Sequence, residues 1–417
     1  MLLRNLYPGA ARLLVTATAI TTVSLAHALD VPYQKLPLSL HASEILPKSA
    51  LSGDGYKLDE KVSNDGAQNT YTLTTHYGVF TVTGTDELLA RIQEVRSTRA
   101  LEKLEDSDEF KDAAKDSLTG MVAGGKALLE EPGETARNAA RGVGRWLGNV
   151  GNSITSDDPH QDNALETVTG YDARKRGYAV SMGVDPYTDF QPFQQQLGEV
   201  SRAATAGGMV TSMAVNLGAD GLLGAVTSVS RAASMQNLLR DNPPSRLAKI
   251  NRDKLLSIGV QGYQADALLR NYNYTPAEST VLCDALQRMG DIEGREIFVA
   301  YATSAPDHEV ANFMQYYAEM LADYILTVET GDIIDVFGKA WMVTDSGNLV
   351  GAFPLDYVAW TPGLDASVTA ASSQMAKGGA KRKEILLRGQ ASPQARAALE
   401  SRGWKVTENV KLAQAAK

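Results

Sequence analysis

The chain has 417 residues, of which 44% are hydrophobic and 21% charged, and its formal net charge is −9 at pH 7. This is an ordinary globular composition with enough length for two or three hydrophobic cores, which excludes a wholly disordered chain. The acidic balance disfavours nucleic acid and anionic membranes as partners of the whole surface and leaves only local basic patches. We therefore expect no nucleic-acid partner.

Residues 1–28 have the pattern of a cleaved secretory signal peptide. Arg4 and Arg12 supply positive charge, residues 13–25 form an uncharged apolar run, and Ala26-His27-Ala28 places small residues at the two positions that a signal peptidase reads. So short an apolar run cannot cross a ~30 Å hydrocarbon core as a helix. We expect cleavage after Ala28 and a periplasmic or secreted protein.

Residues 29–105 are expected to form a small β-rich N-terminal module. An extended lead with several prolines runs to Gly55. Two alternating stretches, 56–62 and 70–75, then flank Asn64-Asp65-Gly66, which is a turn sequence typical of a β-hairpin.

A third strand and a helix complete this predicted module. Residues 78–84 alternate in the manner of a strand. Asp86 is expected to cap a helix that runs to about Leu104.

Residues 106–155 are expected to form a Gly-rich amphipathic helical hairpin, because apolar residues recur there every three or four positions. Its second half carries Arg137, Arg141 and Arg145 at four-residue spacing beside Trp146, an arrangement expected of a helix that lies in a membrane interface. The glycines make it a poor free-standing helix, so it needs a partner. That partner is a bilayer, another protein, or the small-residue helical region that follows in this chain.

The middle of the chain is predicted to be helical. Residues 156–189 lack periodicity and are expected to be a connecting loop, while 190–326 form a helical domain. The clearest helix start is Thr275-Pro276-Ala277-Glu278, with an N-cap Thr, a Pro at N1 and a Glu at N3. Ser304 is expected to open a later helix, whose apolar stripe over 310–324 we interpret as core.

Residues 327–417 are expected to form a strand-rich C-terminal module with a strand-helix-strand end. The predicted elements are strands at 332–337, 339–344 and 348–353, a flexible loop at 363–379, a strand at 384–388, a helix from the cap Ser392 to Arg402, and a strand at 404–407.

The sequence contains no motif that identifies a reaction. The nucleophile motifs of serine hydrolases are absent, and Cys283, the only cysteine, lies in an apolar helical pattern typical of a buried structural thiol. A single cysteine also excludes an internal disulfide framework. The glycines of 142–148 have the wrong spacing for a phosphate-binding loop. We expect no cofactor and no nucleotide.

The histidines do not predict a metal site, because after the signal peptide no two lie within four residues of each other. The one local group of potential ligands is Asp307-His308-Glu309. It falls in the predicted first turn of a helix, where acidic residues stabilise the positive end of the helix dipole. We interpret this trio as a helix start, with a metal or acid/base role as the alternative.

The predicted fold class is α+β, with a predominantly helical middle, a small N-terminal β-rich module and a small C-terminal α/β module. The favoured function is an exported, non-enzymatic binding or structural protein of the bacterial cell envelope. Its partner would be an envelope protein or a membrane surface, and residues 110–154 would contact the membrane.

Two other functions remain open. One is a periplasmic hydrolase of glycan or lipid that gathers carboxylates from distant positions, and Asp332, Asp335 and Asp356 are the first residues to inspect. Two acids about 5 to 9.5 Å apart in a cleft would favour that function. The other is a secreted effector whose small-residue hairpins insert into a target membrane.

Overall fold

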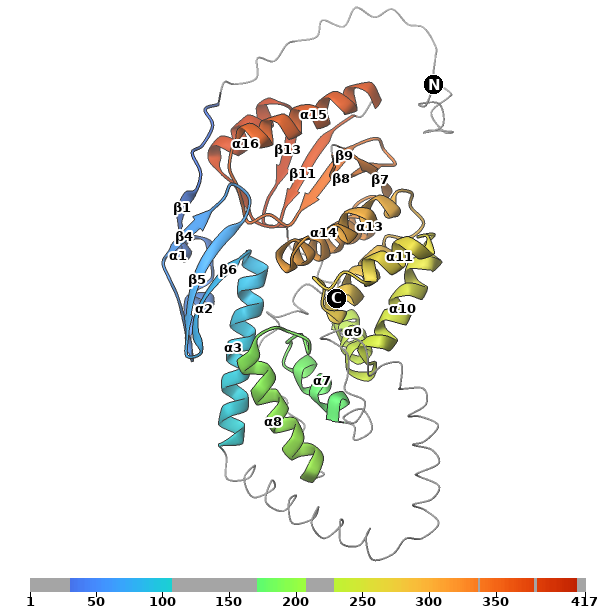
Figure 1. The fold of residues 1–417 in the computed structure, drawn as a ribbon. Helices are drawn as coiled ribbons and strands as arrows, with labels where there is room; N and C mark the ends of the chain where they lie inside the picture. Colours follow the sequence, from blue (N-terminus) through green and yellow to red (C-terminus); the bar gives the residue numbers. More distant parts are fainter. Residues whose placement is uncertain (1–30, 107–170, 208–228, 337, 379–380, 411–417) are drawn as a thin grey trace, which may run out of the picture.

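The computed structural model describes residues 31–106, 171–207, 229–336, 338–378 and 381–410. Within them the predicted α+β class is confirmed, with a β-rich module first, a helical middle and an α/β module last (Figure 1). The predicted signal peptide and the predicted hairpin, with Arg137, Arg141, Arg145 and Trp146, lie outside the described residues. None of the helices in the described ranges has the length and apolar character needed to span a bilayer.

The N-terminal module is an antiparallel sheet with two short helices. Its strands lie in the order β1-β4-β5-β3-β2, and β6 pairs with the remaining side of β5. The elements are β1 (Leu38–His41), α1 (Ala42–Ile45), α2 (Lys48–Leu51), β2 (Ser52–Gly53), β3 (Tyr56–Leu58), β4 (Lys61–Asn64), β5 (Asn69–Thr75) and β6 (Gly78–Thr83). The predicted first strand, 56–62, is divided into β3 and β4, which both pair with β5, and the predicted third strand is confirmed as β6.

The long helix α3 (Thr85–Glu105) follows β6, but Asp86 is not its cap. Gly84 occupies the N-cap position with φ +92° and has no side chain to offer. The N–H of Thr85 instead donates to the carboxylate of Asp356, 3.0 Å away, in the C-terminal module. Asp86 forms an ion pair with Arg388, with its Oδ2 2.6 Å from Nε of the arginine. The acceptor for the first N–H group of α3 therefore comes from a distant segment and not from Asp86.

Two helices join the core of the N-terminal module. These are α7 (Tyr171–Ser181) and α8 (Gln191–Gly207). Helix α8 packs on α3, and α7 packs on α8 (Figure 1). Phe193 and Leu197 are fully buried in the same hydrophobic cluster as Leu88 and Val95. The prediction of a connecting loop over 156–189 was wrong where α7 forms, because burial in this core stabilises a helix that has weak periodicity of its own.

The described part of the middle consists of shorter helices and one long helix. They are α9 (Val229–Asp241), α10 (Pro244–Ser257), α11 (Gly262–Leu269), α12 (Pro276–Arg288), α13 (Arg295–Thr303) and α14 (His308–Thr327). Thr275 caps α12 with the predicted capping box, and Cys283 is fully buried as predicted. Helix α14 begins after Asp307, whose Oδ1 accepts from Val310 N at 2.9 Å, so the expected start at Ser304 was wrong.

The C-terminal module is a mixed sheet in the order β13-β11-β9-β8-β7. Strands β7 to β9 form an antiparallel meander, and β11 pairs in parallel with both β9 and β13. The elements are β7 (Gly331–Asp335), β8 (Ala340–Thr344), β9 (Leu349–Phe353), β10 (Tyr357–Val358), α15 (Pro362–Gly378), β11 (Lys383–Leu387), β12 (Gln390–Ala391), α16 (Pro393–Ser401) and β13 (Trp404–Thr407). The predicted strand-helix-strand end is confirmed, whereas the predicted flexible loop at 363–379 is the helix α15.

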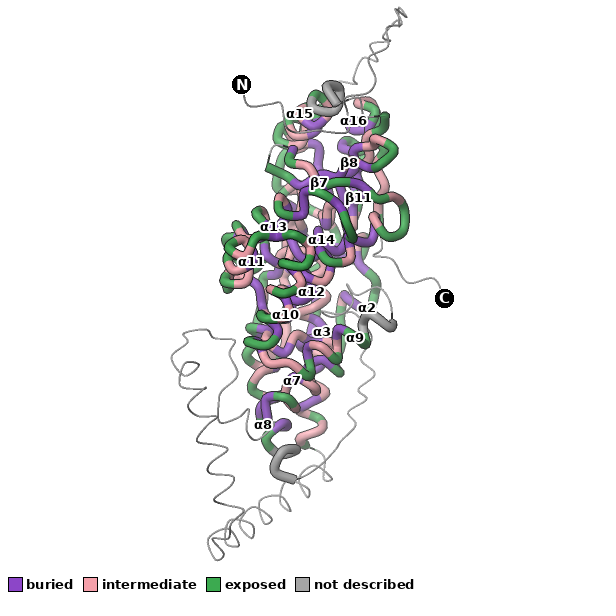
Figure 2. Tube along the Cα trace, turned by 90° about the vertical axis from the view of Figure 1, so that its right-hand side faces the viewer, coloured by how far each residue is buried: buried purple, intermediate pink, exposed green. Residues whose placement is uncertain are grey.

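The lead that precedes β1 is bound to the C-terminal module. Gln34 N donates to Trp360 O at 2.8 Å, and Trp360 Nε1 donates to Val31 O at 3.1 Å. The side-chain oxygen of Gln34 also accepts from Ser392 Oγ at 2.5 Å. Figure 2 shows the helical middle between the C-terminal module and the pair α7 and α8, with buried residues running through all three.

Candidate functional site

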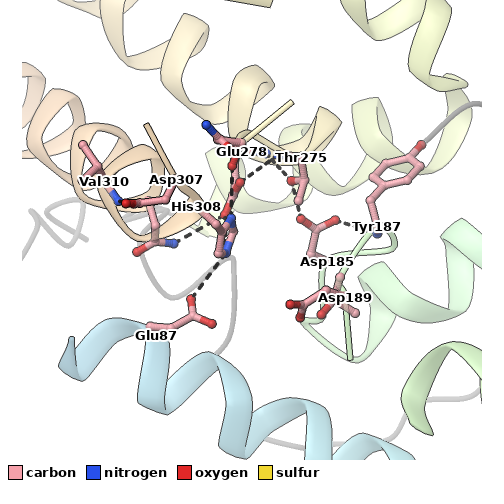
Figure 3. A network of polar contacts seen from close by, with 12 residues as sticks. Glu87, Asp185, Tyr187, Asp189, Thr275, Glu278, Asp307, His308 and Val310 are labelled. Atoms are coloured by element: carbon pink, nitrogen blue, oxygen red, sulfur yellow. Dashed lines mark hydrogen bonds and ion pairs between the residues drawn. The ribbon is translucent and has the colours of Figure 1, made fainter. Parts of the chain in front are cut away.

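A cavity of about 200 Å³ lies where α3, the connection between α7 and α8, and the helices α12 and α14 meet (Figure 3). Its walls combine segments that are far apart in the sequence. The charged residues that line it are Glu87, Arg91, Glu94, Asp185, Asp189, Glu278 and His308.

His308 connects two carboxylates from different helices at the mouth of this cavity. Its Nε2 lies 3.6 Å from Glu278 Oε1 and 4.0 Å from Glu87 Oε2, and its Nδ1 lies 3.1 Å from Asn273 O (Figure 3). Burial lowers the pKa of His308, but the charges of Glu278 and Glu87 outweigh it and raise the pKa to about 9. The imidazole is therefore protonated at neutral pH.

Glu278 is held in place by the start of its own helix. As residue N3 of the capping box, its Oε2 accepts from Thr275 N at 2.8 Å, which leaves Oε1 directed toward His308. The residue is 3% exposed, and burial raises the pKa of its carboxyl to about 7 although the charge of His308 lowers it. Local helix-start chemistry thus positions an acid that titrates near neutrality.

Helix α3 contributes a stripe of three charged residues, since positions 87, 91 and 94 share one face. The guanidinium of Arg91 lies 3.1 Å from Glu94 Oε2, 2.9 Å from Asp189 Oδ1 and 3.7 Å from Glu87 Oε1. It also stacks over Phe190, with its carbon 5.1 Å from the ring centroid. Burial raises the pKa of Glu87 to about 7 and that of Glu94 to about 8.

Asp185 closes the cavity from the connection between α7 and α8. Its Oδ2 accepts from Thr275 Oγ1 at 2.5 Å and its Oδ1 accepts from Tyr187 N at 2.8 Å. Burial raises the pKa of this carboxyl to about 6, against the effect of both hydrogen bonds. Thr275 therefore binds and orients two acids, Asp185 and Glu278.

The chemistry of the cavity is that of buried acids in excess over cations. Five carboxyl groups face one guanidinium and one imidazolium, and burial raises the pKa values of four of them, those of Glu87, Glu94, Asp185 and Glu278. Among the described residues no three potential ligands converge in a way that would hold a metal ion. The arrangement suits binding of a cation or proton transfer by carboxyl groups with pKa values near 7.

The predicted candidate acids do not line this cavity. Asp332 Oδ1 accepts from Glu293 N at 2.9 Å, and Asp335 Oδ1 accepts from Gly338 N at 2.8 Å. Asp356 binds the N–H groups of Thr85 and Asn69. Each of the three acids therefore satisfies backbone donors.

Of the predicted trio, Asp307 has the capping role and His308 belongs to the cavity. The sequence did not predict the other buried acids of the cavity, which are Glu87, Glu94, Asp185 and Glu278. The sequence left an acid/base role open for His308, but it did not indicate which distant acids would lie near this side chain.

Comparison of the chain with protein-family models, with curated proteins and with solved structures finds no match. Function is therefore inferred from the geometry and charge of the cavity itself.

Proposed function

We propose that the protein binds a cationic ligand in the cavity around His308, as an exported binding protein of the bacterial cell envelope. The excess of carboxyl groups over cations in a cavity of about 200 Å³ is the observation that supports this most directly. A ligand ammonium or guanidinium group would favour the ionised carboxylates, which release protons as the ligand enters. The volume suits a group the size of a lysine or arginine side chain.

Export is part of this proposal because of residues 1–28, which have a positive start, a short apolar run and a small-residue cleavage pattern. The presence of a single cysteine, Cys283, fits a protein whose stability comes from burial and polar contacts.

Isothermal titration with cadaverine, an alkyl diamine, tests cation binding. We expect the affinity to rise between pH 6 and pH 8 with release of protons, because Glu87 and Glu278 must ionise to bind the ammonium group. Glu278→Gln should weaken binding tenfold or more, whereas Glu44→Gln, at an exposed position on α1, should leave it unchanged. Absence of binding at every pH, or equal binding by both variants, would contradict the proposal.

A second candidate function is a hydrolase of envelope glycan. It is supported by one observation, namely that Glu87 and Glu278 both lie within 4.0 Å of the same nitrogen of His308. A carboxyl group with a pKa near 7 is suited to act as a general acid. Release of soluble fragments from purified peptidoglycan by the wild type, and its loss in Glu278→Gln, would favour this function over simple binding.

Membrane contact through residues 110–154 remains a separate proposal, supported by the spacing of three arginines beside a tryptophan. We expect the protein to float with anionic liposomes, and joint substitution of Arg137, Arg141 and Arg145 by Glu to abolish flotation. Flotation that is unchanged by the charge reversal would exclude this surface as the contact. Dye release from the same liposomes would indicate insertion, as expected of an effector.

A further inference from the structure

Among the described residues, strand β6 has one edge that pairs with no other strand. It pairs with β5 along its whole length, from Gly78 to Thr83, and with no other strand of the described sheet. Gly84 N donates to Asn69 O at 2.8 Å. Since such bonds recur at every second residue of an antiparallel pair, the N–H and C=O groups of Val79, Thr81 and Thr83 point away from β5.

This edge lacks the features that usually block pairing with another chain. The six residues of β6 include no charged residue and no proline, and Val79 is 66% exposed. The edges of the C-terminal sheet differ, because β7 carries Asp332 and Asp335 and β13 carries Lys405. At the far edges of the N-terminal sheet, β1 has four residues and β2 has two. Short strands and charges discourage strand addition, and β6 has neither.

A second cavity, of about 180 Å³, lies beside β6 and next to the first. Its lining comes from residues 80–83 of β6 and from α3 and α14. The two cavities share four residues, which are Glu87, Arg91, His308 and Asn312. A chain that lies along β6 would therefore be adjacent to the acids around His308.

One face of β6 packs on the core and on Arg91, and the other face is more exposed. Val82 is buried in the core, and the ring of Phe80 packs edge-on to that of Phe190, 5.5 Å away. The guanidinium carbon of Arg91 lies 5.8 Å from the centroid of Phe80. Alternate side chains of an added strand would point to this same face, toward Arg91 and Glu87.

We propose that an extended polypeptide adds as a further strand to the free edge of β6 and places a lysine or arginine side chain in the cavity around His308. The inference rests on the proposed function, because the same carboxylates receive the cation. Charge complementarity selects a basic side chain, since five carboxyl groups against two cationic groups line the first cavity, and Glu87 and Glu309 line the second. Backbone pairing with Val79, Thr81 and Thr83 would supply affinity, and the cavity would supply specificity.

Fluorescence anisotropy with a labelled octapeptide of alternating Thr and Val with one central Lys tests this inference. We expect it to bind at least tenfold more tightly than the same peptide with Glu at the centre. Thr81→Pro removes an outward N–H at an edge position that tolerates proline, and should weaken peptide binding tenfold or more. Thr81→Ala keeps the N–H and is the matched control, with binding expected within twofold of wild type.

Two measurements separate failure of this inference from failure of the proposed function. Cadaverine does not need β6, so Thr81→Pro should bind it as the wild type does. Cadaverine binding without any peptide binding, or equal peptide binding by all three proteins, would overturn the strand addition and leave the cation site standing. If neither probe binds, both proposals fail.

A readout on the wild type removes dependence on the folding of Thr81→Pro. The lysine peptide should slow hydrogen exchange in the segment 78–83, and unchanged exchange at saturating peptide would overturn the inference. A dimer that forms in the absence of peptide, and that Thr81→Pro abolishes, would show that a second copy covers this edge and would also overturn it.

Discussion

Asp356→Ala is expected to lower the free energy of unfolding by about 3 kcal/mol, because it leaves two part-buried backbone donors without a charged acceptor. The Asp356 carboxylate accepts from Asn69 N at 3.0 Å and from Thr85 N at 3.0 Å. It thereby connects the C-terminal module to a strand and to the first residue of α3, whose own N-cap is a glycine. Urea unfolding followed by circular dichroism measures the loss.

Two variants show whether the hydrogen bonds are the cause. Asp356→Asn keeps an oxygen acceptor and should lose less stability than the alanine variant. Asp345→Ala changes an exposed acid in the turn between β8 and β9 and should alter stability by less than about 0.5 kcal/mol. A loss below about 1 kcal/mol in Asp356→Ala would mean that the contact between the modules does not depend on this carboxylate.

The protein is expected to be more stable at pH 6 than at pH 9, by at least about 2 kcal/mol. Burial raises the pKa values of Glu87, Glu94 and Glu278 to between about 7 and about 8 in the folded chain. The folded state therefore holds protons that the unfolded state has already lost, so stability falls as pH rises through this window. His308, with its raised pKa, acts in the same direction up to about pH 9. The value of about 2 kcal/mol does not include His308, because the side chain of His308 is 46% exposed and water screens its ion pairs.

Thermal unfolding at a series of pH values, in one buffer mixture at constant ionic strength, measures this dependence. Glu94→Gln removes the acid with the highest of these carboxyl pKa values and should flatten the decline above pH 6. Glu44→Gln, at an exposed position, should leave the slope unchanged. Stability that increases from pH 6 to pH 9 would show that the cavity acids are ionised and satisfied in the folded protein.

Elements with their own local signals were predictable, and α15 shows where such signals end. Thr275 and Ser392 cap α12 and α16 as expected, because an N-cap hydroxyl and a following proline act within a few residues. The small residues of 363–379 were interpreted as a loop. They form a helix because Val368 and Ala371 are buried beside Trp360, and tertiary burial outweighs a composition that locally favours neither state.

The site was predictable only at the single residue that stood out locally. His308 was recognised in a helix-start trio with an acid/base role as the alternative, but its partners lie on other segments. Glu278 had been explained fully as the N3 residue of a capping box, and the structure gives its second oxygen another contact. A charged stripe beside an apolar face, as on α3 at Glu87, Arg91 and Glu94, normally faces solvent, and no local rule indicates that another domain will cover it.

The bonds between the lead and the C-terminal module affect the order of events during synthesis. Gln34 is held by Ser392, 358 positions later in the chain. At about 5–20 residues per second, a ribosome reaches that partner roughly 20 to 70 s after it has made Gln34. Because α3 also receives its N-terminal acceptor from Asp356, the β-rich module gains these contacts only after the C-terminal module has been made. The lead before β1 is thus made well before the residues that hold it in place.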